Sequence, residues 1–144
     1  MNLIATRIVS AFPGTGKTYY THGDYVPQGF AADSDSSRFS RNELFPFNYV
    51  DHIKSCIGVN QFVFVSTHKL IREALFREKL PFTLVYPDRS LRHEYIKRYY
   101  ERGSHYEFID LLNKNWDTWL DDLQAQRGCD HIVLGSNQFI SNVM

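Results

Sequence analysis

The segment Ser10–Tyr19, which reads S-A-F-P-G-T-G-K-T-Y, constrains the fold more than any other part of this sequence. Residues 11–18, A-F-P-G-T-G-K-T, match the phosphate-binding pattern G-x-x-x-x-G-K-[S/T], except that an alanine replaces the first glycine. The apolar, β-branched stretch from Leu3 to Ala11 predicts a strand just before this loop. A strand that enters such a loop and continues into a helix is typical of a parallel α/β sheet.

Each conserved part of this pattern has a chemical role in binding an anion. Gly14 and Gly16 let the backbone turn so that several N–H groups converge on one point, and the start of the following helix adds partial positive charge. Lys17 is expected to reach the outer phosphates, and the hydroxyl of Thr18 to bind Mg²⁺. A chance G-K-T in an ordinary turn is the alternative interpretation. The residues expected to contact the nucleotide are Pro13, Gly14, Thr15, Gly16, Lys17, Thr18 and Tyr19.

Beyond the loop, strand-like and helix-like segments alternate along the chain. Further strands are predicted at 30–33, 61–66, 82–86 and 131–135, and helices at about 48–58, 70–75, 91–103 and 108–123. Five strands separated by helices imply a mostly parallel sheet in a single α/β domain that spans residues 1–144. In such a sheet the ligand binds beyond the carboxyl ends of the strands.

Composition and charge narrow the classes of protein to which this chain can belong. With 43% hydrophobic and 15% aromatic residues, the chain is expected to fold rather than to stay disordered. The formal net charge of zero gives no global basic footprint for nucleic acid, although a local basic patch remains open. No apolar stretch approaches the ~20 residues that span a bilayer, and no signal peptide is visible. We therefore expect a cytoplasmic protein with no membrane partner.

A second informative stretch is F-A-A-D-S-D-S-S-R-F, which starts at the second predicted strand. Asp33 and Asp35 stand two apart, so in extended structure their side chains point to the same side. One carboxylate could hold the water shell of Mg²⁺, and the other could accept a hydroxyl proton or fix an acceptor. The alternative is a polar loop whose Asp and Ser residues cap a helix. Its position one strand after the phosphate loop favours the catalytic interpretation.

The phosphate loop with its intact lysine, the short chain and the D-S-D together resemble the small P-loop kinases, of the shikimate- and gluconate-kinase type, with nucleotide and polynucleotide 5′-kinases as relatives. The stretches A-F-P-G-T-G-K-T-Y, D-S-D-S-S-R-F, V-F-V-S-T-H-K and V-Y-P-D-R-S-L are similar to uncharacterised bacteriophage P-loop kinase-like proteins. The resemblance implies a three-layer α/β/α fold whose five-stranded parallel sheet has the order 2-3-1-4-5. It also implies that Asp33 serves the metal and Asp35 the acceptor.

Two departures from the family pattern limit what the resemblance implies. The third strand ends in V-S-T-H at residues 65–68, without the aspartate through which motor ATPases and G proteins hold their metal. Small kinases often lack this residue. The glycine-rich motif that shikimate kinases carry after the third strand is also missing, so a shikimate substrate is not expected.

A basic stretch after the fourth strand, within residues 88–104, is a candidate lid. Arg98 and Arg102 are four residues apart and share a helical face. Together with Arg89 they could close over the transferring phosphoryl group and stabilise its charge, and small P-loop kinases place a lid at this point. The alternative is a solvated helix with surface ion pairs worth ~0.2–0.5 kcal/mol each.

These observations favour an ATP- and Mg²⁺-dependent kinase that phosphorylates a small acceptor, with a nucleotide or nucleoside as the favoured class. Asn137, after the last strand, is expected beside the adenine by analogy with the related kinases. Two alternatives stay open: a nucleotide-binding regulatory module with little catalysis, and a kinase for a polynucleotide or modified base. If the protein is viral, the cytoplasm is that of the host.

Overall fold

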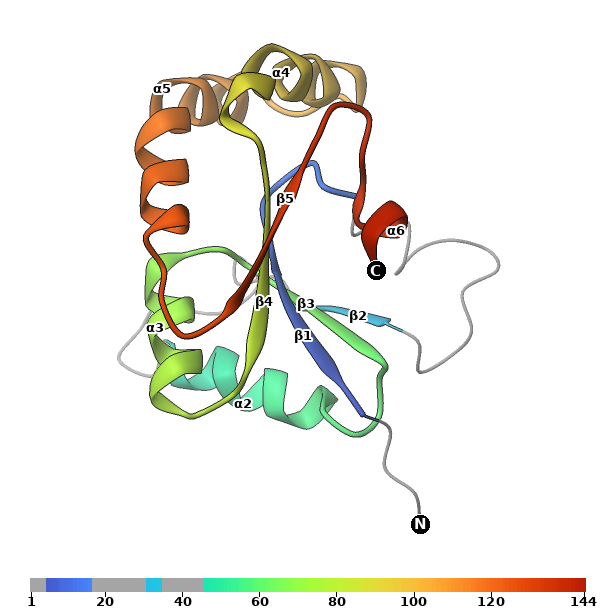
Figure 1. Cartoon of the computed structure of the whole chain (residues 1–144), viewed down its shortest axis with the longest axis vertical. Helices are drawn as coiled ribbons and strands as arrows, with labels where there is room; N and C mark the ends of the chain where they lie inside the picture. The colour runs from blue at the N-terminus through green and yellow to red at the C-terminus, as the bar shows by residue number, and fades with distance from the viewer. Residues whose placement is uncertain (1–4, 17–30, 35–45) are drawn as a thin grey trace.

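The computed structural model describes residues 5–16, 31–34 and 46–144 of the 144-residue chain, and residues 31–34 only in their backbone. Strands and helices alternate along this part of the chain, so the predicted α/β class is confirmed (Figure 1). The elements are β1 (Arg7–Ala11), β2 (Ala31–Ser34), α2 (Phe47–Cys56), β3 (Phe62–Val65), α3 (Lys69–Arg77), β4 (Phe82–Pro87), the 3-10 helix η2 (Arg89–Leu91), α4 (Arg92–Glu101), α5 (Tyr106–Gln124), β5 (Asp130–Leu134) and α6 (Ile140–Val143).

All strand pairs in the described sheet are parallel, and the strands follow the order β2-β3-β1-β4-β5. Ser10 of β1 is in register with Val65 of β3 and Leu84 of β4. The carboxyl ends of these strands therefore lie at one edge of the sheet. The loop that follows β1 leaves the sheet at this edge, as predicted.

Side chains alternate between the two faces of the sheet, as the period of a strand requires. On one face, Leu84 and Tyr86 pack with the buried side chains of α4 and α5. On the same face, Ile8, Val63 and their neighbours pack against α2 and α3. Four helices thus cover this face, and Figure 1 shows α3 and α5 together on one side of the strands.

The opposite face of the sheet carries a separate apolar cluster. Val9, Phe64 and Val85 are fully buried there and pack with Ile140 of α6. Figure 1 shows α6 on the other side of the strands from α3 and α5. The sequence analysis did not predict α6, because this helix is only four residues long and is too short to show helical periodicity.

The helix α5 is long and strongly one-sided. Its side chains at Ile109, Leu112, Trp116, Leu120 and Leu123 are buried, which is the spacing of one helical face and lies within the predicted range 108–123. None of the described helices combines the length and the apolar character that crossing a bilayer would require.

Candidate functional site

The loop after β1 has the backbone conformation that its glycines permit. Gly14 has φ of 87° and Gly16 has φ of 98°, values at which residues with a Cβ are strained. Thr15 between them is completely buried, and its Oγ1 donates to the carbonyl oxygen of Phe12 at 2.7 Å. A turn that includes left-handed residues can bring successive N–H groups together into an anion-binding nest.

Three carbonyl groups of this loop are held by donors from distant parts of the chain. The Tyr99 hydroxyl donates to the Pro13 oxygen at 2.8 Å. The Arg98 guanidinium donates to the Gly14 oxygen at 2.9 Å. The backbone N–H of Ile140 donates to the Thr15 oxygen at 2.9 Å. Every carbonyl oxygen from 13 to 15 thus has a fixed outer partner on α4 or α6.

These carbonyl bonds also orient the amide groups. In a planar trans peptide the N–H points opposite to the C=O of the same unit. The amides of Gly14 and Thr15 are therefore directed away from α4, and the amide of Gly16 away from the start of α6. Within the described residues, none of these three N–H groups donates a hydrogen bond to another group. They are available to an anion in front of the loop.

The side chain of Arg98 is held in place on several sides. Its guanidinium carbon lies 4.3 Å from the centre of the Tyr95 ring and 4.1 Å from that of Phe139. A carboxylate oxygen of Glu94 lies 3.4 Å from Arg98 Nη2. Sandwiching between two rings favours a planar guanidinium over an ammonium. Arg98 therefore acts as a fixed support for the loop.

Glu94 connects α4 to the segment that follows β5. Its carboxylate accepts hydrogen bonds from the Ser136 hydroxyl at 2.6 Å and from the Asn137 amide at 3.3 Å. The Ser136 hydrogen bond is the main cause that holds the pKa of Glu94 below its ordinary value, with smaller contributions from the Asn137 amide and Arg98. Asn137, expected beside adenine, adopts φ of 58° and lies in this segment. Residues 136–139 are thus tied to α4 beside the loop.

At both loop glycines, neighbouring aromatic rings occupy the space that a Cβ would need. A Cβ on Gly14 would approach the Tyr99 ring to 2.9 Å, and a Cβ on Gly16 would approach the Phe139 ring to 3.0 Å. The rings pack so closely only because these positions are glycine. Tyr99, Glu94 and Phe139 are site residues that the sequence analysis missed. No sequence signal indicates the contact of Tyr99, because its hydrogen-bond partner Pro13 lies 86 residues away in the chain.

The candidate lid, residues 88–104, is well packed in this structure. Tyr95 and Tyr99 are fully buried in the cluster that also contains Phe12 and Trp116. Moving the whole segment away from the loop would expose both tyrosines, at a cost of about 1.5–3 kcal/mol for each large side chain. The lid function stays a prediction, and opening the lid would require this free energy.

The other two arginines predicted for the site have different surroundings. Arg89 forms ion pairs with Asp117 and Asp121 of α5, and its carbonyl oxygen accepts from Trp116 Nε1 at 2.9 Å. Arg102 donates to the Ser104 hydroxyl at 2.9 Å and lies over the Tyr99 ring. Of the three predicted arginines, only Arg98 contacts the loop within the described residues.

The remaining predicted residues fall largely outside the described part of the chain. Lys17, Thr18, Tyr19 and Asp35 lie there, and Asp33 is placed by its backbone alone. In β2, Asp33 is in register with Phe64 of β3, one residue before that strand ends. Because β3 separates β2 from β1, the backbone of Asp33 lies roughly 10 Å from β1 across two strand spacings. Among the described residues no cluster of three metal-ligating side chains occurs.

A cavity of about 390 Å³ opens beside the loop, and we call it the loop-side cavity. Phe12 and Pro13 form its boundary with the loop. Residues 66–69, at the end of β3 and the start of α3, form a polar rim, while α5 forms an apolar wall. His68, which comes just before α3, is exposed on this rim.

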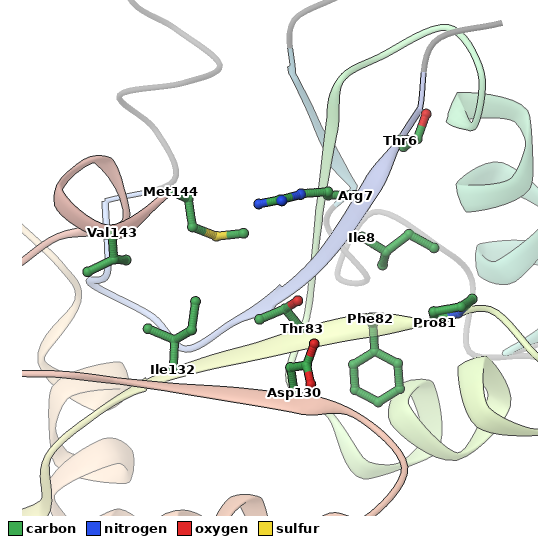
Figure 2. A pocket seen from close by; sticks show the side chains of 10 residues that line it. All are labelled: Thr6, Arg7, Ile8, Pro81, Phe82, Thr83, Asp130, Ile132, Val143 and Met144. Atoms are coloured by element: carbon green, nitrogen blue, oxygen red, sulfur yellow. The ribbon is translucent and has the colours of Figure 1, made fainter.

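A second cavity, of about 430 Å³, lies at the amino ends of β1, β4 and β5 (Figure 2). Figure 2 shows Arg7, Phe82 and Asp130 around it, together with Val143 and Met144 from the end of the chain. It therefore lies at the opposite end of the strands from the loop. It contributes nothing to an anion site at the carboxyl edge.

No protein-family model matches this chain, and no curated protein matches it. The geometry of the loop and its surroundings is therefore the basis for assigning a function. Three amides that donate no hydrogen bond among the described residues, at the carboxyl edge of a parallel sheet, can bind an oxyanion. The cavity next to them can hold a second small molecule.

Proposed function

We propose that this protein is an ATP- and Mg²⁺-dependent P-loop kinase of the cytoplasm that phosphorylates a small acceptor, with a nucleotide or nucleoside favoured. The main support for the proposal is that the carbonyl groups of Pro13, Gly14 and Thr15 all accept hydrogen bonds from α4 or α6. The amides of the same peptide units therefore point the other way, where they can bind phosphate oxygens. The parallel order β2-β3-β1-β4-β5 supports the three-layer P-loop fold implied by the family resemblance.

In this proposal the loop and the residues after it bind the triphosphate. The amides of Gly14, Thr15 and Gly16 hold phosphate oxygens, and Lys17 follows them directly in the chain. Thr18 and Asp33 are the candidates for holding Mg²⁺, directly or through its water shell. The metal would neutralise phosphate charge and orient the leaving group when bound.

Asp35 is the candidate residue for activating the acceptor. The acceptor oxygen bonds to the γ-phosphorus while the bond from that phosphorus to the β–γ bridging oxygen breaks, and ADP leaves with that oxygen. When the acceptor is a hydroxyl, its proton passes to Asp35 as general base. When the acceptor is a phosphate, it is already ionised and Asp35 only positions it.

Arg98 supports this chemistry through the loop. It fixes the Gly14 carbonyl and so orients the Thr15 amide toward the phosphates. We assign Arg98 as a positioning residue. Arg89 and Arg102 would reach the transferring group only after a rearrangement of their contacts on α5 and α4.

The test is transfer of labelled phosphate from Mg·ATP to a panel of nucleosides, nucleotides, sugars and DNA ends. We expect transfer to at least one small acceptor, and a loss of about 10²-fold or more in rate for Asp35→Asn if that acceptor is a hydroxyl. The variant should keep its affinity for ATP. A protein that binds Mg·ATP but labels no acceptor, and that Asp35→Asn leaves unchanged, would be a binding module instead of a kinase.

A further inference from the structure

The loop-side cavity has one strongly apolar wall. Phe108 and Trp119, both partly exposed, contribute aromatic rings to its lining, and Leu111 contributes an aliphatic side chain that is 50% exposed. Phe12 also lines the cavity but is only 1% exposed. Flat aromatic surfaces favour contact with another flat ring, through stacked or edge-on packing. A sugar or other polyol would leave its hydroxyl groups against this wall without partners, which is costly.

The rim formed by residues 66–69 is polar and has free donors among the described residues. Among the described residues, the Thr67 hydroxyl and the Lys69 ammonium group form no hydrogen bond or ion pair. Both belong to the short stretch between β3 and the first turn of α3. They can donate to carbonyl oxygens or ring nitrogens of a ligand that lies against the apolar wall.

The buried Arg72 at the cavity already has ion-pair and hydrogen-bond partners within the protein. Arg72 is 2% exposed, and it forms an ion pair with Asp122. It also donates to the Thr67 carbonyl oxygen at 2.8 Å and to Gln126 at 2.7 Å. Because three of its N–H groups are engaged and the residue is only 2% exposed, Arg72 fixes the position of the rim and is not expected to bind an anionic ligand directly.

We propose that the loop-side cavity binds the base of a free nucleoside or nucleotide, which is the acceptor of the kinase reaction. This inference rests on the proposed function. The volume of about 390 Å³ falls within the range of small-molecule sites. A lining that combines aromatic side chains with hydrogen-bond donors fits a heterocycle that has both a flat face and polar edge atoms. Phe12 and Pro13 place the cavity next to the phosphate loop.

The chain as a whole has no excess positive charge to favour a polynucleotide substrate. Formal net charge is zero over the whole sequence. Binding a long polyanion draws most of its affinity from basic residues and released counterions. We therefore commit to a free nucleoside or nucleotide, and a nucleic-acid strand is an outcome of the test.

The test measures Trp119 fluorescence and calorimetric binding for the full chain in the presence of Mg·ADP. The probes are the four deoxynucleosides, their 5′-monophosphates, glucose and a short single-stranded oligonucleotide. Trp119 lines the cavity, whereas Trp116 is fully buried. We expect at least one nucleoside or monophosphate to change the fluorescence, and Trp119→Phe to abolish that change.

The matched variants are Leu111→Asn and Leu70→Asn. Both leucines lie on helices and are about half exposed, at 50% and 54%, but only Leu111 lines the cavity. Leu111→Asn should weaken nucleoside binding about tenfold, because it removes apolar contact with the base. Leu70→Asn should leave binding unchanged, and both variants should fold.

The outcomes separate this inference from the kinase proposal. If Mg·ATP binds but only glucose or only the oligonucleotide responds, or if the two leucine variants behave alike, the cavity assignment is wrong and the kinase proposal stands. If nucleosides bind with the predicted dependence on Leu111 while Mg·ATP does not bind, the cavity assignment stands and the kinase proposal falls.

Discussion

The Arg98 guanidinium donates a hydrogen bond to the carbonyl oxygen of Gly14 at 2.9 Å, although 84 residues separate the two in the chain. The bond joins the middle of α4 to the phosphate loop. Because the Gly14 carbonyl and the Thr15 amide belong to one peptide plane, Arg98 orients an amide that we assign to the phosphates. The shape of the loop thus depends on a helix far from it in sequence.

Replacing Arg98 with methionine should therefore damage both the fold and nucleotide binding. The hydrogen bond comes from a charged donor, so we expect a loss of about 1.5–3 kcal/mol in the free energy of unfolding and a fall of about tenfold or more in ATP affinity. Arg92→Met on the same helix is the control. Arg92 pairs with Asp117 in an exposed position, and such pairs contribute at most about 1 kcal/mol. Equal effects in urea unfolding and ATP titration would contradict the role of Arg98.

Two buried tyrosines on α4 offer a paired test of the loop contacts. Burial raises the pKa of Tyr99, so its hydroxyl stays protonated and donates to the Pro13 carbonyl oxygen. Tyr99→Phe should cost about 0.5–1.5 kcal/mol and weaken ATP binding. The Tyr95 hydroxyl is buried without a hydrogen-bond partner in the described structure. Tyr95→Phe should therefore be neutral or stabilise the fold by about 1 kcal/mol. Thermal unfolding of both variants distinguishes them, and the reverse order of stability would exclude this account.

A third prediction concerns the backbone of the loop. Gly16→Ala places a Cβ at φ of 98° and within 3.0 Å of the Phe139 ring. Gly103→Ala is the control, because Gly103 also has positive φ, at 77°, but a Cβ there meets nothing within 4 Å. Both changes should cost about 1–2 kcal/mol through backbone strain. Only Gly16→Ala should abolish ATP binding in calorimetry, and retained affinity in that variant would show that the loop does not wrap the phosphates.

The link between Glu94 and residues 136–137 predicts a pH dependence. The Ser136 hydrogen bond lowers the folded pKa of Glu94, so the ionised form stabilises the fold above the unfolded pKa. This contribution should be lost as the pH falls through the folded pKa, below the ordinary glutamate value of about 4.3. Urea unfolding at a series of pH values should show a smaller acid loss in Glu94→Gln than in the native chain. Glu101→Gln, which removes an exposed pair with Lys97 at 3.8 Å, should keep the native profile.

The sequence predicted most strands and helices because their patterns are local. An apolar run predicted a strand at 61–66, where β3 spans Phe62–Val65, and helical spacing predicted a helix at 108–123, where α5 spans Tyr106–Gln124. On α4, Tyr95 and Tyr99 are buried, whereas Tyr100 is 56% exposed, because it lies on the outer face of the same helix.

The partners of the loop could not be predicted, because they depend on the arrangement of distant elements. Nothing in the pattern around Arg98 distinguishes a contact with Gly14 from a surface pair with Glu94, and the structure contains both. The ion pairs of α5 depend on distant elements in the same way. Asp122 pairs with Arg72 of α3, whereas Asp117 and Asp121 pair with Arg89, which the packing of η2 on α5 brings to them.

The central claim, that this loop holds the phosphates of ATP, is tested most directly by calorimetric titration of the full chain with Mg·ATP, with Lys17→Ala titrated in parallel. We predict one-to-one binding by the native chain and a loss of about tenfold or more in affinity for Lys17→Ala. Absence of binding to the native chain, or equal affinity in the variant, would contradict the claim.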